Sequence, residues 1–378
     1  MADLFAGPEN GEGEATEGIA RVDEKRRRGR GAALNMGSRY DRVSAEPVDD
    51  GWSEVGPDAD VPALRTEVTI DRSRSVLTRN TSPDVPFDRS VNPYRGCEHG
   101  CVYCFARPSH AQLGLSPGLD FETRLVAKPE APALLAKALR RKGYAVAPIA
   151  IGTNTDPYQP IERQYRVMRG VLEVLERFGH PVTVTTKGAG ITDDLDILGR
   201  MARRGLADVT ISLTTLDPRL SRSFEPRAAA PGRRLAAIRA LVKAGVPVRA
   251  NLSPLIPGLT DHELESLAEA AAAAGATAAN YTMLRLPLEV SPLFRDWLAR
   301  ERPARAGRVM ALVREMHGGK DYDAAWGKRL RGEGVLARLI ARRFELACRR
   351  HGLGRLPPLR TDLFAPPPQP GDQLSLSL

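Results

Sequence analysis

Residues 92–110 read NPYRGCEHGCVYCFARPSH and hold three of the four cysteines of the chain. Cys97, Cys101 and Cys104 follow the spacing C-x3-C-x2-C, whereas Cys348 lies far downstream. Thiolates are soft ligands that select zinc, copper(I) or iron–sulfur clusters. A structural metal site is closed by its protein ligands, and a catalytic site keeps a position open. Three clustered cysteines therefore favour a centre with one position left for another ligand.

A structural zinc site is the alternative for the same stretch. His99 and His110 lie beside the thiols, and Cys3His is an ordinary zinc set. His99 falls between two cysteines on a tight loop, so His110 is the better placed of the two. Zinc fingers usually pair two C-x2-C knuckles, and this stretch has a single triplet. The spacing favours a cluster and leaves zinc open.

Composition bounds the class of protein. The chain has 378 residues, of which 42% are hydrophobic and 5% aromatic, so Ala, Leu and Val fill much of a large core. No apolar run reaches the roughly 18–20 residues that cross a bilayer, and the N-terminus lacks a signal-peptide pattern. We expect a cytoplasmic protein without membrane contact. Thiols stay reduced there, which favours metal binding or catalysis over disulfides.

The charge balance is basic, with a formal net charge of +9. A basic surface suits a polyanion such as DNA or RNA, although an Arg- and Ala-rich composition can arise without such a partner. Residues 1–60 are poor in bulky apolar residues and are predicted to be a disordered tail. The run KRRRGR at 25–30 within it is either a phosphate-binding arm or a solvated segment.

Short β-rich runs alternate with helical runs between residues 61 and 290. This alternation predicts a parallel sheet, and six βα units predict an α/β fold of the partial (βα)6 TIM-like barrel type. A doubly wound sheet is the competing topology. One strand is expected before the cysteines, and the others at 146–153, 181–187, 208–215, 246–254 and 277–284. Helices ending at glycine are expected at 129–142, 160–178, 191–204, 231–244 and 260–274.

The remaining C-terminal sequence divides into two parts. Residues 291–360 are predicted to form a helical extension that packs on the barrel, with Cys348 as a buried helical cysteine. Residues 361–378 are Pro-rich and predicted to be disordered. Their last six residues, Gln373 to Leu378, resemble the Q-L-x-L peptides that dock on DNA sliding clamps.

Polar residues that follow the predicted strands are candidate ligands for a cofactor, because a barrel gathers its chemistry at the carboxyl ends of its strands. Thr153, Asn154 and Asp156 follow one strand, although Asp156 also suits a turn and Asn154 a helix cap. Lys187 ends the next strand and, if buried, needs a carboxylate partner. A solvent-facing Lys187 is the alternative.

Two further strands present alternating polar residues, which point the same way along a strand. Ser212 and Thr214 lie on one, and Arg249 and Asn251 on the next. The loop that holds Glu225 and Arg227 is expected to fold over the barrel mouth. The sequence does not assign these residues to cofactor or to substrate.

C-x3-C-x2-C with an aromatic residue before the last cysteine resembles the radical S-adenosylmethionine (SAM) superfamily, over about residues 85–290. The resemblance implies that Cys97, Cys101 and Cys104 hold a [4Fe–4S] cluster whose open iron binds SAM. It implies reductive cleavage of SAM to a 5′-deoxyadenosyl radical, with electrons from a donor such as flavodoxin or ferredoxin. The aromatic residue, Tyr103, is a candidate catalytic residue.

Four stretches are similar to the branch related to spore photoproduct lyase, a DNA-repair enzyme: 92–107, 153–162, 182–188 and 211–215. The matching position in that branch implies that Lys187 binds the carboxylate of SAM. The lyase has a tyrosine after its last cluster cysteine and a hydrogen-donating cysteine after its second strand. This chain has Phe105 and the segment 152–155, without cysteine, at those places. It is therefore expected to belong to the branch but to lack its radical relay.

Two functions from different classes follow. The first is a radical SAM enzyme that acts on DNA or RNA, with a protein or a small molecule as the other possible substrate. The second is a non-catalytic nucleic-acid-binding protein stabilised by zinc or by a cluster, in which the basic run makes the contacts.

Overall fold

A seven-stranded sheet forms the centre of the computed structural model, which describes residues 19–40 and 63–368. The strand order is β12-β11-β10-β9-β8-β5-β4, and every neighbouring pair is parallel except β4 with β5. The strands are β4 (Leu77–Arg79), β5 (Arg89–Val91), β8 (Ile149–Ile151), β9 (Val182–Thr186), β10 (Ala207–Leu213), β11 (Val248–Leu255) and β12 (Ala278–Met283).

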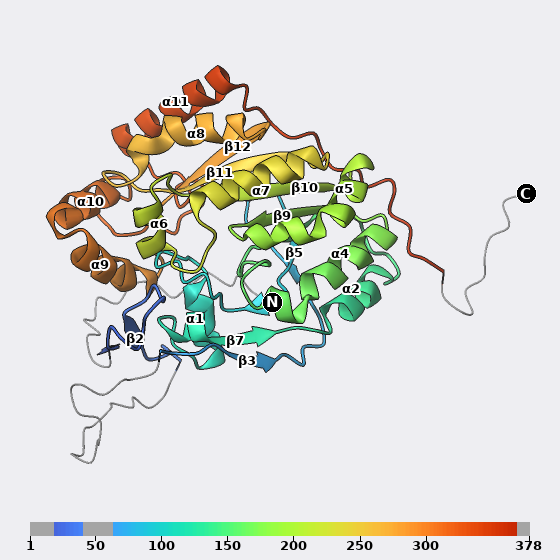
Figure 1. The fold of residues 1–378 in the computed structure, drawn as a ribbon, viewed down its shortest axis with the longest axis horizontal. Helices are drawn as coiled ribbons and strands as arrows, with labels where there is room; N and C mark the ends of the chain where they lie inside the picture. The colour runs from blue at the N-terminus through green and yellow to red at the C-terminus, as the bar shows by residue number, and fades with distance from the viewer. Residues whose placement is uncertain (1–18, 41–62, 369–378) are drawn as a thin grey trace, which may run out of the picture.

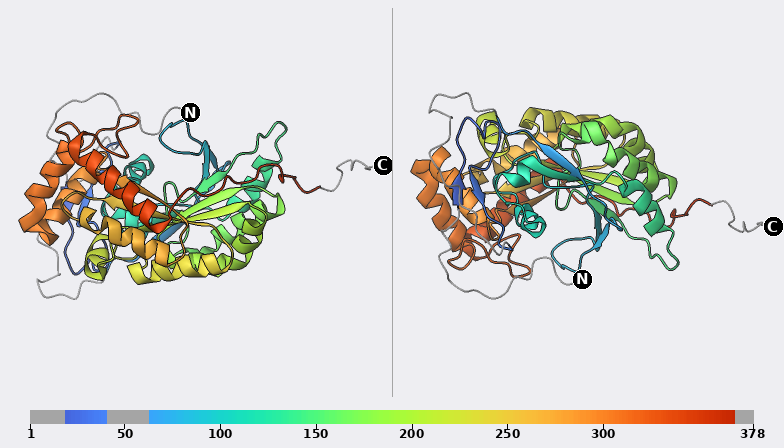
Figure 2. Two further views of the ribbon diagram at one scale, coloured as in Figure 1. Left: turned by 90° about the horizontal axis from the view of Figure 1, so that it is seen from above. Right: turned by 90° about the horizontal axis from the view of Figure 1, so that it is seen from below.

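The six parallel strands follow one another across the sheet in chain order. A doubly wound sheet reverses this order at a switch point, so that alternative is excluded. The helices that follow the strands cover one face of the sheet (Figures 1 and 2), and the predicted partial barrel of six βα units is confirmed. They include α2 (Ala131–Leu139), α3 (Glu162–Tyr165), α4 (Val167–Arg177), α5 (Leu195–Arg203), α6 (Pro218–Phe224), α7 (Pro231–Lys243) and α8 (Leu264–Ala273).

Alternation along each strand separates the core from the barrel interior. Val209 and Ile211 of β10 are fully buried and belong to one apolar cluster with Ile238 of α7. Thr210 and Ser212 lie between them in sequence and therefore point to the opposite face. The interior of the barrel is thus polar, whereas the space between sheet and helices is apolar.

The N-terminal hairpin (residues 19–40) corrects one prediction. The sequence predicted a disordered tail, but β1 (Ile19–Arg21) and β2 (Leu34–Met36) pair there. Leu34 and Met36 pack with Leu119 and with Leu293 of α9 (Val290–Glu301). The hairpin needs few apolar residues because it packs on an existing surface. The other residues of the predicted tail, 1–18 and 41–60, lie outside the described residues.

The helical extension is present, with α9, α10 (Pro303–Glu315) and α11 (Gly334–His351), and α11 packs on α8. Beyond it, a C-terminal strap (residues 353–367) crosses the amino ends of the strands. Its residues 361–367 were predicted to be disordered, but Phe364 packs on Tyr144 and His180. Residues 373–378 lie outside the described residues.

Shorter elements surround the cysteine stretch. A second sheet has the order β3-β7-β6, from Glu67–Ile70, Arg124–Ala127 and Tyr94–Arg95. Helix α1 is Asp120–Thr123, and 3-10 turns span η1 (Arg107–Leu113), η2 (Ala189–Asp194) and η3 (Asp261–Glu263). None of the helices in the described ranges is long and apolar enough to cross a membrane.

Candidate functional site

The cysteine loop (residues 92–110) lies at the carboxyl end of β5, at the mouth of the barrel. Cys97 and Cys101 are buried, Cys104 is partly buried, and all three are free thiols. Burial raises the pKa of Cys97, and Asp156 and the other two thiols raise it further. Burial also raises the pKa of Cys101 to about 12. The three thiols therefore lie within electrostatic reach of one another.

Arg107 fixes the shape of the cysteine loop through buried hydrogen bonds. Its guanidinium is fully buried and donates to the carbonyl oxygen of Cys101 at 3.0 Å and of Gly118 at 2.8 Å. Its charge is balanced by Glu122, whose carboxylate lies 2.6 Å away. A buried ion pair of this kind is costly to break, because either partner alone would be an unpaired buried charge. Sequence analysis missed both residues, although Arg107 lies three positions after Cys104.

The N-terminal hairpin joins the same network. The backbone N–H groups of Gly31 and Ala32 donate to the Glu122 carboxylate at 2.8 and 2.9 Å. A Cβ atom on Gly31 would lie 1.9 Å from the carbonyl oxygen of Gly100, which lies between two of the cysteines. The hairpin is therefore a tightly fitted support for the cysteine loop.

The loop after β8 holds the other side of the cysteine loop. Thr153 bonds Asn92 through its hydroxyl at 3.1 Å, and the Asn154 amide donates to the Ser109 hydroxyl at 3.0 Å. The Gln159 side chain accepts the backbone N–H of Glu98 at 2.9 Å. Thr153 and Asn154 were predicted to bind a cofactor, and the structure gives them partners within the chain. A direct cofactor role for them stays a prediction.

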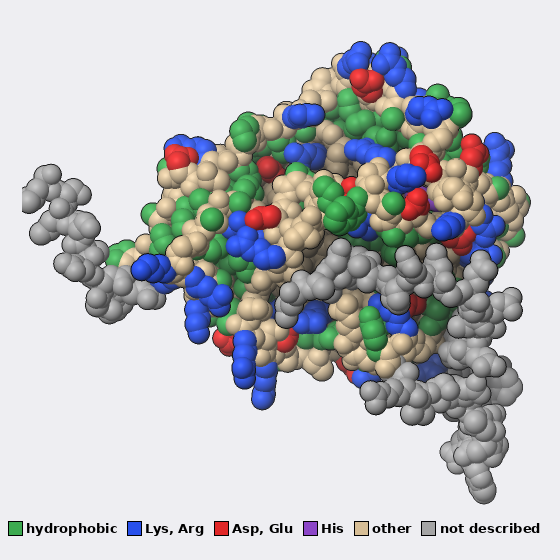
Figure 3. Space-filling view, turned by 180° about the vertical axis from the view of Figure 1, so that it is seen from behind, with side chains coloured by type: hydrophobic (Ala, Val, Ile, Leu, Met, Phe, Trp, Pro, Cys, Tyr) green, Lys and Arg blue, Asp and Glu red, His purple; other side chains and the backbone are tan. Residues whose placement is uncertain are grey.

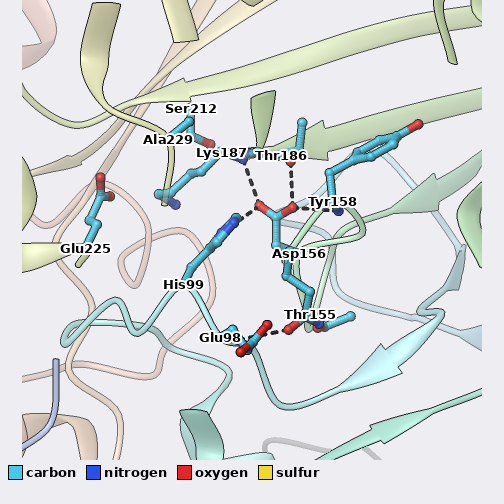
Figure 4. Close-up of polar contacts among 12 residues, drawn as sticks. Glu98, His99, Thr155, Asp156, Tyr158, Thr186, Lys187, Ser212, Glu225 and Ala229 are labelled. Atoms are coloured by element: carbon cyan, nitrogen blue, oxygen red, sulfur yellow. Dashed lines mark hydrogen bonds and ion pairs between the residues drawn. The ribbon is translucent and has the colours of Figure 1, made fainter. Parts of the chain in front are cut away.

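Asp156 joins the two loops at the centre of Figure 4. Its carboxylate accepts the Thr186 hydroxyl at 2.6 Å and the backbone N–H of Lys187 at 2.7 Å. It also lies 3.4 Å from Nδ1 of His99. Burial alone would raise the pKa of Asp156, but His99 and these donors lower it to about 2. Asp156 therefore aligns the two loops, as the turn-forming alternative expects, and a direct cofactor contact of Asp156 stays a prediction.

Lys187 extends from the end of β9 toward Glu225 (Figure 4). Burial alone would lower its pKa, but Cys101 and Glu225 raise it, and the net direction is upward. Its ammonium lies 5.7 Å from the centre of the Tyr103 ring. Among the described residues, no hydrogen-bond acceptor and no ion-pair partner is in contact with this ammonium. An ammonium without a direct partner at this place fits a ligand that carries a carboxylate.

Tyr103, the candidate catalytic residue, lies under the mouth with its phenol engaged. It donates to the Glu225 carboxylate, and Thr214 donates to the same carboxylate at 2.8 Å. Arg234 is buried and forms an ion pair with Glu225. Burial would raise the pKa of Glu225, but Arg234 and Lys187 hold it below its usual value. The cluster Tyr103–Thr214–Glu225–Arg234 is a second buried support for the cysteine loop, and sequence analysis missed Arg234.

Ser212, Asn251 and Asn280 form one row across the barrel interior, because register pairs Ser212 with Asn251 and Asn251 with Asn280. The side-chain oxygens of both asparagines are buried and have no hydrogen-bond partner among residues 19–40 and 63–368. Buried polar atoms without a partner are unusual and costly in a finished protein interior. The row therefore offers hydrogen-bonding groups to a molecule inside the barrel. Sequence analysis predicted Ser212 and Asn251 and missed Asn280.

The two histidines do not complete a zinc site. Nε2 of His110 lies 3.0 Å from the carbonyl oxygen of Arg124, and its ring packs edge-on against Phe121. His99 contacts Asp156. Within residues 19–40 and 63–368, no three His, Cys, Asp or Glu side chains converge on a point that one metal ion could occupy. A [4Fe–4S] cluster binds each thiolate to a different iron, so the three thiols fit a cluster better than a single ion.

Two other predicted residues lie as follows. Arg227 reaches the cysteine loop, donating its backbone N–H to the His99 carbonyl at 3.2 Å and lying 3.4 Å from the Glu98 carboxylate. The loop that carries it therefore folds over the mouth as expected. Cys348 packs against the barrel core on α11, apart from the clusters that contain the other cysteines.

Comparisons with known proteins agree with this geometry. Residues 91–271 match the radical SAM superfamily. An uncharacterized protein of Mycobacterium tuberculosis is 37% identical over 282 residues, which cover 72% of this chain and 83% of that protein. An uncharacterized protein of Methanocaldococcus jannaschii is 24% identical over 173 residues, covering 46% and 62%.

Solved structures of spore photoproduct lyase share the fold. A mutant with bound AdoMet and dinucleoside spore photoproduct superposes with a TM-score of 0.56 at 14% identity, covering 76% of this chain and 80% of that chain. A complex with dinucleoside spore photoproduct gives a TM-score of 0.55 over the same shares.

Proposed function

Because the chain belongs to the radical SAM superfamily, it is an enzyme that uses a [4Fe–4S] cluster and SAM, and we propose that its substrate is nucleic acid. The non-catalytic alternative is set aside by this membership. The substrate class rests on the surface around the mouth, and the roles of single residues rest on the contacts described above.

We assign the cluster to Cys97, Cys101 and Cys104, which supply three free thiols on one braced loop. When bound, the cluster and SAM supply a 5′-deoxyadenosyl radical that takes a hydrogen atom from the substrate. Lys187 is assigned to the carboxylate of SAM, because its ammonium points to the cysteine loop without an ion-pair partner among the described residues. Arg107 and Glu225 are positioning residues that keep the loop in place.

The interior row receives the rest of the cofactor or the reacting part of the substrate. Asn251 and Asn280 present two unpaired side-chain oxygens to the barrel interior, and Ser212 lies beside them. Such acceptors suit hydroxyl and amino groups, which both SAM and nucleosides carry. Their position in the interior supports a reaction site between the sheet and the cysteine loop.

A basic turn fixed beside the cysteine loop is the observation that carries the choice of nucleic acid. Lys25, Arg26 and Arg28 are exposed, and no carboxylate among the described residues forms an ion pair with them. Arg30 and Gly31, which follow after Gly29, bond to Glu122, the residue that pairs with Arg107 beneath the cysteine loop. Fixed basic side chains next to a mouth attract phosphate groups.

The rest of the surface gives less support to the choice of nucleic acid. Figure 3 shows the face of the molecule opposite to the one in Figure 1. Lys and Arg side chains are scattered over this face, with Asp and Glu side chains among them. The net charge of +9 therefore does not mark a single patch there. The fold adds a second line of support, because a lyase with the same fold binds a dinucleoside spore photoproduct.

The reaction on nucleic acid is proposed to differ from that of the lyase. Phe105 follows the last cluster cysteine, and residues 152–155 lack a cysteine. Neither a phenyl ring nor a threonine can return a hydrogen atom as a phenol or a thiol does. A reductant of the flavodoxin or ferredoxin class is proposed as electron donor. The sliding-clamp contact of residues 373–378 stays a prediction.

The test uses anaerobically purified, iron-loaded protein and fluorescein-labelled single-stranded DNA, duplex DNA and RNA. Binding is followed by anisotropy at several salt concentrations. Replacing Lys25, Arg26 and Arg28 together with Gln is expected to lower the salt slope by about 2–3, near 0.7–0.9 per lost phosphate contact. A control with Arg338, Arg350 and Arg355 on and beyond α11 changed to Gln removes the same charge and should leave the slope unchanged.

A second measurement tests turnover on the same polymers. Adding deuterated DNA or RNA is expected to increase 5′-deoxyadenosine formation relative to a reaction without nucleic acid. Deuterium is expected to appear in the 5′-deoxyadenosine. Binding without salt dependence, or transfer from a peptide or small molecule in place of nucleic acid, would overturn the proposed substrate class.

A further inference from the structure

An arginine stacks on Phe105, the residue that follows the last of the three clustered cysteines. Arg285 follows β12, and its guanidinium carbon lies 4.5 Å from the centre of the Phe105 ring. The ring of Tyr322, from the segment between α10 and α11, lies 6.0 Å away, and its hydroxyl accepts Nη2 of Arg285 at 3.3 Å. Three separate segments therefore meet at this guanidinium.

The charge of Arg285 is not balanced by any carboxylate among the described residues. In the described ranges, no Asp or Glu forms an ion pair with it, and its buried Nε has no hydrogen-bond partner. The arginines that brace the mouth from below differ in this respect, since Arg107 pairs with Glu122 and Arg234 with Glu225. Arg285 is half-buried, so water compensates its charge only in part.

The stack also sets what the guanidinium can bind. Packing against Phe105 fixes the plane of the fork in advance, which reduces the side-chain entropy lost on binding. A planar guanidinium with free N–H groups matches the oxygens of a phosphate or carboxylate in a bidentate manner. An anion held there would lie beside Phe105, the residue that follows Cys104.

We propose that Arg285 is a phosphate-binding residue of the substrate site, with Phe105 and Tyr322 as the walls that orient it. This inference rests on the proposed function, because it gives the ligand as a phosphate of nucleic acid. It assigns Phe105 a binding role at the position where the lyase has its tyrosine. The carboxylate of SAM carries the same chemistry, and the experiment separates the two sources.

The experiment compares Arg285→Gln, Arg285→Lys and the control Arg308→Gln, an exposed arginine of α10 without an ion pair in the described structure. One arm measures binding of a fluorescein-labelled oligothymidylate to iron-loaded protein by anisotropy over a range of salt. The other arm measures SAM binding to the same preparations by calorimetry. Unchanged SAM binding also shows that each variant is folded.

We expect Arg285→Gln to weaken oligonucleotide binding about tenfold, the size of one charged hydrogen-bonding contact, and to lower the salt slope by about one. Arg285→Lys keeps the charge without the planar fork, so it should restore the slope and recover affinity only in part. Arg308→Gln should match the unmodified protein in both arms.

Three outcomes would overturn the inference. If Arg285→Gln binds oligothymidylate as Arg308→Gln does, the phosphate assignment fails while the proposed function stands. If Arg285→Gln weakens SAM binding and leaves oligonucleotide binding intact, the anion is the carboxylate of the cofactor. If the unmodified protein does not bind the oligonucleotide at all, the proposed substrate class fails together with the inference.

Discussion

At the bottom of the barrel, the C-terminal strap crosses the amino ends of the strands through backbone hydrogen bonds and aromatic contacts, whereas at the mouth the cysteine loop is held by buried charges. Gly354 and Arg360 of the strap bond the carbonyl oxygens of Thr277 and Gly205. His180 beneath the strap uses both ring nitrogens, toward Tyr144 and Pro181 at 2.9 Å each. Below β9, β10 and β12, the bottom of the barrel is thus closed by contacts within the chain.

The mouth is also held by contacts within the chain, but some of its polar groups lack hydrogen-bond partners among the described residues. Arg107–Glu122 and Arg234–Glu225 are paired and buried, yet the polar groups above them are not all satisfied. Side-chain atoms of Asn251, Asn280 and Arg285 lack partners within the described structure. Since an unpaired buried group costs about 1–3 kcal/mol, the difference between the two ends indicates where ligands belong.

The largest expected effect is the loss of one cluster ligand. Replacing Cys97, Cys101 or Cys104 singly with Ala should abolish both cluster-bound iron and SAM cleavage, because each thiol is assigned to its own iron. Iron and sulfide assays and 5′-deoxyadenosine formation measure this. Cys348→Ala, on the side of the barrel away from the loop, should retain both. If Cys348→Ala lost iron, the assignment of the cluster to Cys97, Cys101 and Cys104 would be wrong.

The next effect tests whether the N-terminal hairpin supports the mouth. Gly31→Ala should lose most of the iron, because the added Cβ would lie 1.9 Å from the Gly100 carbonyl oxygen and overpacking costs about 1–3 kcal/mol. Iron content after anaerobic reconstitution is the measurement. Gly37→Ala is the matched control, since its Cβ meets no atom within 4 Å. Equal iron in the two variants would show that the hairpin is dispensable.

The sequence predicted the barrel because each strand carries its own local signal. β10 is buried along its whole length and β11 is buried on one face throughout, and their polar residues alternate as expected of strands. The three cysteines were equally visible, because all of them lie within eight consecutive residues. Local patterns thus predicted the sheet, and they are the basis of the proposed ligand set.

The supports of the mouth could not be predicted in the same way, because their partners are distant in sequence. Glu122 meets Gly31 across 91 positions, and Tyr103 meets Glu225 across 122. Phe364 likewise packs on His180, which is distant in sequence, so residues 361–367 were predicted to be disordered. Charged residues without periodicity give no signal of a pair that forms only after folding.

A smaller effect tests the unpaired lysine at the mouth. Lys187→Met keeps the apolar stem but removes the charge, so SAM affinity should fall about tenfold, equivalent to about 1.4 kcal/mol. Calorimetry on iron-loaded protein measures it. Lys142→Met removes an exposed charge from the opposite end of the barrel and should bind SAM as the unmodified protein does. Loss of iron together with SAM binding would instead make Lys187 a support of the loop.

The smallest effect concerns the bottom and is specific to pH. Burial lowers the pKa of His180 to about 4 from its ordinary value of 6.5. The unfolded chain therefore binds more protons between these values, and stability present above pH 6.5 is lost as the pH falls toward 4. Between pH 7 and pH 5, this single residue should cost about 2 kcal/mol of unfolding free energy.

Urea denaturation at the two pH values, compared with His180→Phe, isolates that cost, because Phe keeps the contact with the strap and cannot be protonated. The variant should lose about 2 kcal/mol less than the unmodified protein on acidification. His262→Phe, at an exposed position, serves as the control for replacing a histidine elsewhere. If His180→Phe loses as much stability on acidification as the unmodified protein, burial does not disfavour protonation of His180. The bottom of the barrel would then be as open to water as the mouth.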